Sequence, residues 1–240
     1  MKILGVIPAR YASSRFPGKP LIDIGGKTMI QRVYEQACKA SQLMGVVVAT
    51  DDNRIKDEVL RFGGKVIMTA HTHLNGTERC AEVAEHSDCD AIINIQGDEP
   101  FIHPEQIDLL AACFTKPATQ IATLVIPQSD TDGFDNPNRI KVVLNKELEA
   151  LYFSRSAIPY PRNNTQGQPW YQHIGIYGYR KDVLLQLVKL APSNLELTES
   201  LEQLRWLENG YRIQCALTSH QSHSVDTPED AEKIKSLLSL

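Results

Sequence analysis

Short apolar runs alternate regularly with amphipathic stretches over the first half of this chain. The apolar runs have the length of β-strands, and the stretches between them repeat apolar residues every three or four positions, as helices with one buried face do. The strand-like runs are residues 3–8, 46–50, 65–68, 91–95 and 121–127, and the helix-like stretches are residues 29–39, 53–62, 78–86 and 104–114. This order predicts an α/β fold: a doubly wound, mostly parallel, Rossmann-like sheet in a three-layer α/β/α arrangement.

Capping residues stand where the predicted helices begin. Thr28 suits the N-cap of the first helix, residues 51–53 that of the second, and either Thr77 or residues 75–76 that of the third. Pro104 suits the first turn of the fourth helix, because its fixed φ angle is helical and its missing N–H is not needed there. The local signals and the periodicity therefore indicate the same elements.

The pattern changes after about residue 130. We expect strands at 139–144, 151–153 and 174–179, a proline-containing polar loop at 159–169, helices at 181–190 and 198–209, a strand at 211–217 and a helix beginning at Thr227. This predicts a single domain over residues 1–240 with an inserted antiparallel region around residues 130–180.

Positive charge gathers at the N-terminal end of the sequence. Residues 1–41 contain seven Lys or Arg against two acidic residues, although the whole chain has a formal net charge of −4. The net charge argues against a nucleic-acid partner, which needs a broad cationic face, whereas a local cationic pocket suits a small polyanion. With neither a signal-peptide pattern nor an apolar segment of about 20 residues, we expect a cytoplasmic protein with no membrane partner. The five cysteines form no C-x-x-C pair and predict reduced thiols.

The long loop after the first strand, residues 8–20, carries three cations. Arg10, Arg15 and Lys19 can converge on one phosphate chain at the carboxyl edge of a parallel sheet, and Ser14 can add a neutral donor. The alternative is a surface loop with incidental charges. Neither G-x-x-x-x-G-K-[ST] nor G-x-G-x-x-G occurs in the chain, so the usual marks of P-loop NTPases and dinucleotide-binding enzymes are missing.

The same loop reads I-P-A-R-x-x-S-x-R-x-P-G-K-P over residues 7–20 and resembles the sugar nucleotidyltransferases that make CMP-sugars. Within these it is most similar to the 3-deoxy-D-manno-octulosonate (Kdo) cytidylyltransferases, or CMP-Kdo synthetases. Further blocks resemble that family in its order, namely residues 76–79, 94–100, 141–143, 150–159, 173–179, 201–205 and 225–230. The resemblance covers essentially the whole chain. It implies a Mg²⁺-dependent homodimer, assembled partly through the inserted region, that makes CMP-Kdo and diphosphate from CTP and Kdo for lipopolysaccharide biosynthesis.

Acidic side chains at a predicted strand end indicate a metal site. Asp98 follows the buried strand at 91–95, and a carboxylate beside a nucleotide requires a cation between them, so we expect Asp98 to bind Mg²⁺. The resemblance implies the same role for Asp226. From the residues alone, the sequence around Asp226 favours a helix N-cap over a metal ligand.

The resemblance also implies which residues bind the substrates. For the nucleotide they are Ala9, Arg10, Ser14, Arg15, Lys19, Thr77, Glu78, Arg79 and Gln96. For the sugar acid they are Gln96, Lys141, Arg155, His173, Tyr177 and Glu199. The catalytic set is Arg10, Lys19, Asp98 and Asp226. Two simpler interpretations stay open: Thr77 and Glu78 also suit a helix start, and His173 and Tyr177 also suit a packed pair on one strand face.

Other functions remain compatible with these motifs. One is a cytidylyltransferase for another sugar acid, 8-amino-Kdo or a sialic acid, because such enzymes share the first loop. Another is a non-catalytic regulator that binds CTP. Arg139 and the length of residues 160–168 depart from the family pattern and bear on the choice of sugar and on dimer contacts.

Overall fold

The structure is a computed structural model of the whole chain, and it describes all residues except 13–15, 130, 163–168, 222–223, 226 and 239–240. The strands are β1 Ile3–Ala9, β2 Gly45–Thr50, β3 Val66–Met68, β4 Ala91–Asn94, β5 Ile121–Gln128, β6 Lys141–Leu144, β7 Ala150–Ser154, β8 Trp170–Arg180 and β9 Ile213–Leu217. The helices are α1 Met29–Ala37, α2 Asn53–Arg61, α3 Gly76–Glu85, α4 Pro104–Cys113, α5 Thr131–Phe134, α6 Lys181–Leu187, α7 Asn194–Glu199, α8 Gln203–Glu208 and α9 Pro228–Leu238, with a short 3₁₀ helix at Lys19–Leu21.

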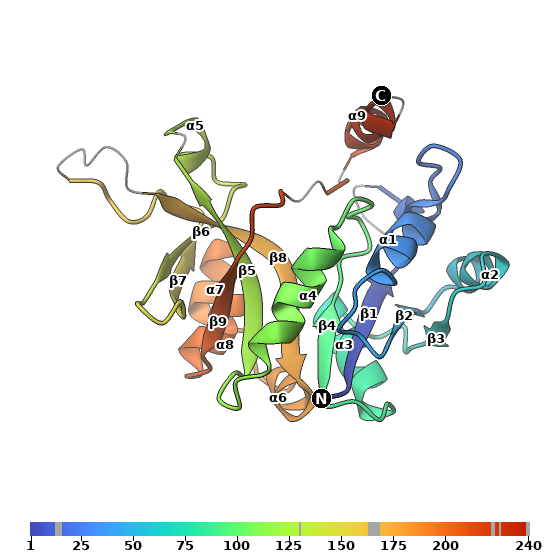
Figure 1. Cartoon of the computed structure of the whole chain (residues 1–240), viewed down its shortest axis with the longest axis horizontal. Coiled ribbons are helices and arrows are strands. Elements are labelled where there is room, and N and C mark those ends of the chain that lie inside the picture. Colours follow the sequence, from blue (N-terminus) through green and yellow to red (C-terminus); the bar gives the residue numbers. More distant parts are fainter. Residues whose placement is uncertain (13–15, 130, 163–168, 222–223, 226, 239–240) are drawn as a thin grey trace.

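The sheet confirms the predicted α/β fold and adds one feature to it. Its strand order is β3-β2-β1-β4-β8-β5-β9, and β3, β2, β1 and β4 pair in parallel, as β5 and β9 also do. Strand β8, which we expected inside the inserted region, lies in the centre of the sheet and runs antiparallel to both β4 and β5. Its first half also pairs with β6, which pairs with β7, so β6 and β7 extend from the main sheet (Figure 1). Apolar and aromatic side chains suit β8 to a position buried on both faces.

Helices cover both faces of the sheet, as a continuous apolar sheet requires. Side chains of α1, α2 and α4 pack against one face, and side chains of α3, α6 and α8 pack against the other. Figure 1 shows α1 and α4 in front of the strands. The last helix, α9, contributes Ala231 and Ile234 to a separate small cluster with Ile24, Met29 and Val225, so the end of the chain packs near the start of α1.

The predicted helix starts are confirmed for the most part. Thr28, Asp52 and Asn75 each accept a hydrogen bond from a backbone N–H of the helix they cap, so Asn75 rather than Thr77 caps α3. Pro104 lies in the first turn of α4. Among the described residues, no helix combines the length and apolar character needed to span a membrane.

The single helix expected over residues 198–209 is wrong. The structure has α7 and α8, separated at Ser200, whose φ of 51° is left-handed. The reason is burial: α7 has no buried residue, whereas Leu201 and Leu204 pack into the core. One straight helix would not expose the first segment and bury the second, so the chain turns at Ser200.

Candidate active site

A cavity of about 300 Å³ opens where β1 and β4 end and α3 begins. Its walls come from four parts of the chain, residues 8–10, residues 19–20, residues 73–76 together with Arg79, and residues 96–98. Five of the residues expected to bind the nucleotide line it, namely Ala9, Arg10, Lys19, Arg79 and Gln96, and so does the expected metal ligand Asp98. The carboxyl edge of parallel strands is the usual place for a ligand in an open α/β sheet.

Two glycines let the walls approach one another closely. A Cβ atom on Gly97 would lie 2.9 Å from the carbonyl oxygen of Pro8, and one on Gly76 would lie 3.0 Å from the Pro8 ring. The first distance is shorter than Cβ contacts in proteins, and the second is tighter than most of them. The loop after β4 can therefore approach the end of β1 this closely because Gly97 lacks a side chain, and Gly76 lets the start of α3 lie tightly against Pro8.

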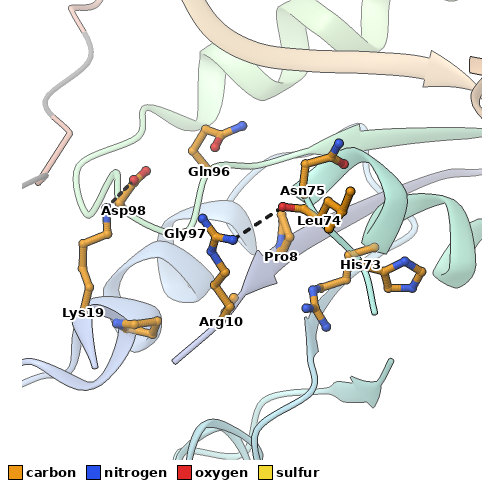
Figure 2. A pocket seen from close by; sticks show the side chains of 13 residues that line it. Pro8, Arg10, Lys19, His73, Leu74, Asn75, Gln96, Gly97 and Asp98 are labelled. Carbon is orange, nitrogen blue, oxygen red and sulfur yellow. Dashed lines mark hydrogen bonds and ion pairs between the residues drawn. The ribbon is translucent and has the colours of Figure 1, made fainter. Parts of the chain in front are cut away.

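An ion pair lies at one end of the cavity. The Lys19 ammonium donates a hydrogen bond to the Asp98 carboxylate at 2.7 Å, and both side chains are largely shielded, with 16% and 26% of their area exposed. Gly18, with φ of 74°, makes the turn that starts the 3₁₀ helix carrying Lys19. Arg10 lies between this pair and Leu74, whose carbonyl oxygen accepts a bond from the guanidinium at 3.5 Å (Figure 2).

Arg79 forms part of the cavity wall from a buried position. Only 3% of the residue is exposed, and its guanidinium lies 3.3 Å from the carboxylate of Asp51, just after β2, and also hydrogen-bonds the Thr69 hydroxyl. Asp51 thus balances the charge of Arg79 inside the protein. This ion pair holds the guanidinium in a fixed place beside the cavity.

Thr77 and Glu78 contact other partners and are not among the residues that line the cavity. The Thr77 hydroxyl donates to the carboxylate of Glu202 at 2.9 Å, and burial raises the pKa of that carboxyl. Glu78 accepts a hydrogen bond from the Leu74 amide at 2.8 Å. Both side chains hold the start of α3 in place, in line with the simpler interpretation left open by the sequence.

The cavity also has wall residues that our sequence analysis did not assign to it. His73, Leu74 and Asn75 form the wall opposite the Lys19–Asp98 pair (Figure 2). The His73 imidazole hydrogen-bonds Glu82 and lies 3.8 Å from Glu78. The only local signal there was the helix start at Asn75, which says nothing of a ligand.

Three of the residues expected to bind the sugar acid form a second polar cluster, near β6 and β7. The Glu199 carboxylate accepts bonds from the Ser154 hydroxyl at 2.6 Å and the Arg155 amide at 2.9 Å. Arg155 donates to backbone carbonyls, including that of Glu199 at 2.7 Å. The buried Lys141 ammonium donates to the Arg155 carbonyl at 2.5 Å, and burial lowers its pKa. Three long charged side chains are thereby fixed against the backbone.

His173 and Tyr177 share one face of β8, as the sequence predicted, with ring centroids 5.3 Å apart. Residues four positions apart in a strand share a face, and a register shift in β8 places His173 and Tyr177 opposite Val125 and Thr123, which are only two positions apart on β5. The His173 Nε2 and the Thr123 hydroxyl lie 3.0 Å apart, and burial lowers the pKa of His173 to about 3. The imidazole is therefore neutral at neutral pH.

The residues that line the cavity and the residues expected to bind the sugar acid come closest where β4 pairs with β8. Asn94, the last residue of β4, pairs with Tyr177, and Gln96 follows two positions later. Gln96 lines the cavity, whereas Tyr177 packs edge-on against Trp206 at 5.1 Å on the sheet face beyond. The end of β4 thus lies next to β8, and the loop that follows β4 lines the cavity.

Three expected site residues, Ser14, Arg15 and Asp226, lie outside the described residues. The backbone amide of Val225 donates to the carbonyl oxygen of Asp98 at 2.9 Å, and Val225 is completely buried. The segment that ends at Val225 is thereby attached to the loop that carries the expected metal ligand.

This arrangement, an α/β sheet with a cationic cavity and one carboxylate at its carboxyl edge, is typical of nucleotide-binding transferases. The sequence matches the cytidylyltransferase family model over residues 4–213, and the chain belongs to that family. Among its relatives, the 3-deoxy-manno-octulosonate cytidylyltransferases of Parabacteroides distasonis and Bacteroides thetaiotaomicron are 55% and 52% identical to it. Each alignment covers 99% of this chain and 98% of the relative.

A solved structure of a CMP:2-keto-3-deoxy-manno-octonic acid synthetase complexed with CTP is similar over the whole chain. Its TM-score is 0.94 at 46% identity, with 100% of this chain and 99% of the other covered. A 4-diphosphocytidyl-2C-methyl-D-erythritol synthase from Anaerococcus prevotii, at a TM-score of 0.66 and 12% identity, shares the fold alone.

Proposed function

We propose that this protein transfers the cytidylyl group of CTP to the anomeric hydroxyl of Kdo, giving CMP-Kdo for lipopolysaccharide biosynthesis and releasing diphosphate. The observation that carries this proposal is the Lys19–Asp98 pair at the cavity, in a chain 46% identical to a synthetase complexed with CTP. Cations and a carboxylate side by side suit a triphosphate that is bound together with a metal ion.

The nucleotide would occupy the cavity with its phosphates toward Arg10 and Lys19. Both side chains carry donors that can bind phosphate oxygens, and the Lys19 ammonium is already turned into the cavity by its bond to Asp98. The base would then lie toward residues 73–79, where Arg79 is held by Asp51. A fixed wall of this kind limits how the base can sit.

The donor set at the cavity fits Mg²⁺. Asp98 offers carboxylate oxygens, which hard divalent cations prefer, and it lies beside the cations that would bind phosphate. We propose that Asp98 and Asp226 hold the ion, and the bond between Val225 and Asp98 supports a shared site. When bound, Mg²⁺ neutralises phosphate charge and lowers the pKa of a nearby hydroxyl.

The sugar acid would lie beyond Gln96, toward β8. Lys141 and Arg155 carry two positive charges, and Glu199 neutralises one of them. The remaining positive charge would attract the carboxylate of a sugar acid. The neutral His173 offers a hydrogen bond without adding charge, which suits recognition of sugar hydroxyls.

In the reaction, the anomeric oxygen forms a bond to the α-phosphorus while the bond from that phosphorus to the bridging oxygen of diphosphate breaks. The hydroxyl proton leaves to solvent. Arg10 and Lys19 stabilise the negative charge that grows on diphosphate, and the cavity holds the two substrates in line.

A substrate panel tests this function. The protein is incubated with CTP, Mg²⁺ and one acid at a time, Kdo, 8-amino-Kdo or a sialic acid, and diphosphate is measured. We expect release with Kdo, at a rate at least ten times that with either other acid. A preference for another acid would assign the enzyme to that substrate, and CTP binding without diphosphate release would identify a regulator.

We also propose a homodimer that forms partly through the inserted region. Strand β7 pairs only with β6 among the described strands, and Leu151 and Tyr160 are 59% and 83% exposed. Light scattering should give twice the mass of the chain, and Leu151→Arg should shift the measured mass toward that of a single chain. A monomeric wild type would contradict the proposal.

We also propose that the protein lies in the cytoplasm, because the proposed reaction consumes CTP.

A further inference from the structure

A cluster of metal-ligating side chains lies where α4 begins. His103 is the N-cap residue of α4, Glu105 belongs to its first turn, and His220 follows the end of β9. One ligand atom from each of the three residues can be chosen so that all lie within 4.8 Å of one another. None of the three is among the residues that line the nucleotide cavity.

The distances within this cluster suit a single ion. The Glu105 carboxylate oxygen lies 2.9 Å from the His220 Nε2 and 3.9 Å from the His103 Nδ1. Around a tetrahedral ion with bonds of 2.0–2.1 Å, ligand atoms lie about 3.4 Å apart, between these two values. The His103 Nδ1 is shielded from solvent and makes no hydrogen bond in the described part of the chain, although the imidazole faces the Gln106 amide in a capping-box arrangement. It can bind a metal ion once the ring has turned away from that amide.

The two imidazole rings must adjust to bind an ion. They stack nearly in parallel, with centroids 3.7 Å apart and an angle of 8° between the planes. A ligated ion lies close to the plane of each ring, so at least one ring has to turn about its χ2 torsion, for which His has a broad preference. The side chains of His103 and His220 are 44% and 33% exposed, which leaves room for this rotation.

Imidazole nitrogens select the kind of ion. Two imidazoles and one carboxylate suit Zn²⁺, Co²⁺ or Ni²⁺, whereas Mg²⁺ prefers oxygen ligands and water. We propose that His103, Glu105 and His220 bind one transition-metal ion of the zinc class, at a site separate from the nucleotide cavity. Glu105 lies in the first turn of α4, where a carboxylate offsets the positive end of the helix dipole.

An ion at this site would join the start of α4 to the segment after β9 that leads to Val225. The buried Gln106 side chain already connects them, because it accepts a bond from the His103 amide and donates one to the His220 carbonyl, each at 3.1 Å. Further along the second segment, Val225 bonds the Asp98 backbone. The ion would therefore stabilise the folded chain, since it binds only where both segments are in place.

Zn²⁺ binding to the full-length protein tests the proposal. Affinity is measured by competition with a chromophoric zinc chelator, with millimolar Mg²⁺ present and no substrate. We expect one Zn²⁺ per chain and a higher melting temperature with Zn²⁺. His220→Phe, which keeps a ring for the stack, and Glu105→Gln should each weaken binding at least tenfold, because even outer partners of metal ligands cost about 10- to 100-fold.

Matched variants identify the site. His86→Ala and Cys38→Ser remove an exposed imidazole and an exposed thiol elsewhere and should leave the affinity unchanged. The proposal is overturned if the wild type does not bind Zn²⁺, if His220→Phe binds it equally well, or if His73→Ala abolishes binding instead. None of these results involves CTP or Kdo, so they leave the proposed function untouched.

Discussion

At the scale of single residues, the Lys19–Asp98 pair brings together two roles that the proposed function needs. In the unliganded chain each side chain neutralises the other, at 2.7 Å and largely away from solvent. In the proposed function, binding of a triphosphate with its metal ion would give each a new partner, the ammonium a phosphate and the carboxylate the cation. The cost of separating the pair would then be offset by two charge-assisted contacts.

Lys19→Ala should raise the KM for CTP by at least about tenfold and slow diphosphate release, because it removes a charge-assisted contact to the phosphates. Steady-state diphosphate release at varied CTP measures this. Lys27→Ala is the control, since Lys27 pairs with Glu35 on the surface and both side chains are about 40% exposed. A KM within twofold of the wild-type value would remove Lys19 from the phosphate site.

His173 should make the protein less stable in mild acid. The pKa of His173 is about 3 in the folded chain, below the ordinary value of 6.5. Between these two pH values the imidazole is therefore protonated in the unfolded chain and neutral in the folded chain. This stability is fully present above pH 6.5 and is lost as the pH falls toward 3. Between pH 7.5 and 5 the loss is about 1–2 kcal/mol, from one proton per chain.

Urea unfolding of the wild type and of His173→Gln at both pH values measures the effect. The free energy of unfolding should fall by that amount more in the wild type than in the variant. Equal pH dependence of the two proteins would show that His173 is not held neutral.

At the scale of elements, the close approach of β1 and the loop after β4 builds the cavity. The approach depends on Gly97, where even a methyl group would meet the Pro8 carbonyl at 2.9 Å. Backbone cannot move aside as the end of a flexible side chain can. In a variant with a side chain at position 97, either the loop that carries Gln96 and Asp98 or the end of β1 would have to shift.

Gly97→Ala should therefore lower the free energy of unfolding by about 1–3 kcal/mol, the usual cost of overpacking. It should also weaken CTP binding, because two walls of the cavity are displaced. Gly175→Ala is the control, since a Cβ atom there meets nothing within 4 Å. Equal urea midpoints for the two variants would mean that the approach is not tight.

Elements were predictable from the sequence where local signals decide them, and less so where distant contacts do. The alternation of strands and helices, the caps at Thr28 and Asp52 and the position of Asp98 at a strand end all follow from short stretches of sequence. The central position of β8 follows from its pairing with β4 and β5, and the break at Ser200 follows from burial of Leu201. The spacing of apolar residues along the chain shows neither which strands pair nor which of two neighbouring segments is buried.

The site residues were likewise predictable where a local motif marks them and not where distant contacts decide. The loop motif located Arg10 and Lys19, and both lie at the cavity. Thr77 contacts Glu202, the residue before α8, and this contact between residues 125 positions apart depends on the tertiary fold. The wall formed by His73 had no signal, because a single histidine in a loop is not distinctive.

At the scale of the whole molecule, the sheet joins two parts with different tasks. The parallel strands β1 and β4 end at the cavity that we propose for the nucleotide, whereas β6, β7 and the first half of β8 carry residues expected to bind the sugar acid. The parts meet at the pairing of Asn94 with Tyr177. A reaction between a nucleotide and a sugar acid needs such a junction, since each substrate must reach the other from its own pocket.

The central claim is that Asp98 serves the chemical step at a triphosphate site. Single-turnover diphosphate release from CTP with saturating Kdo and Mg²⁺, measured beside CTP affinity, tests it for Asp98→Asn. We predict a rate at least about 100-fold below that of the wild type with CTP affinity largely kept, because the amide preserves the shape of the site but not the charge that holds the metal ion. A near wild-type rate would contradict the claim.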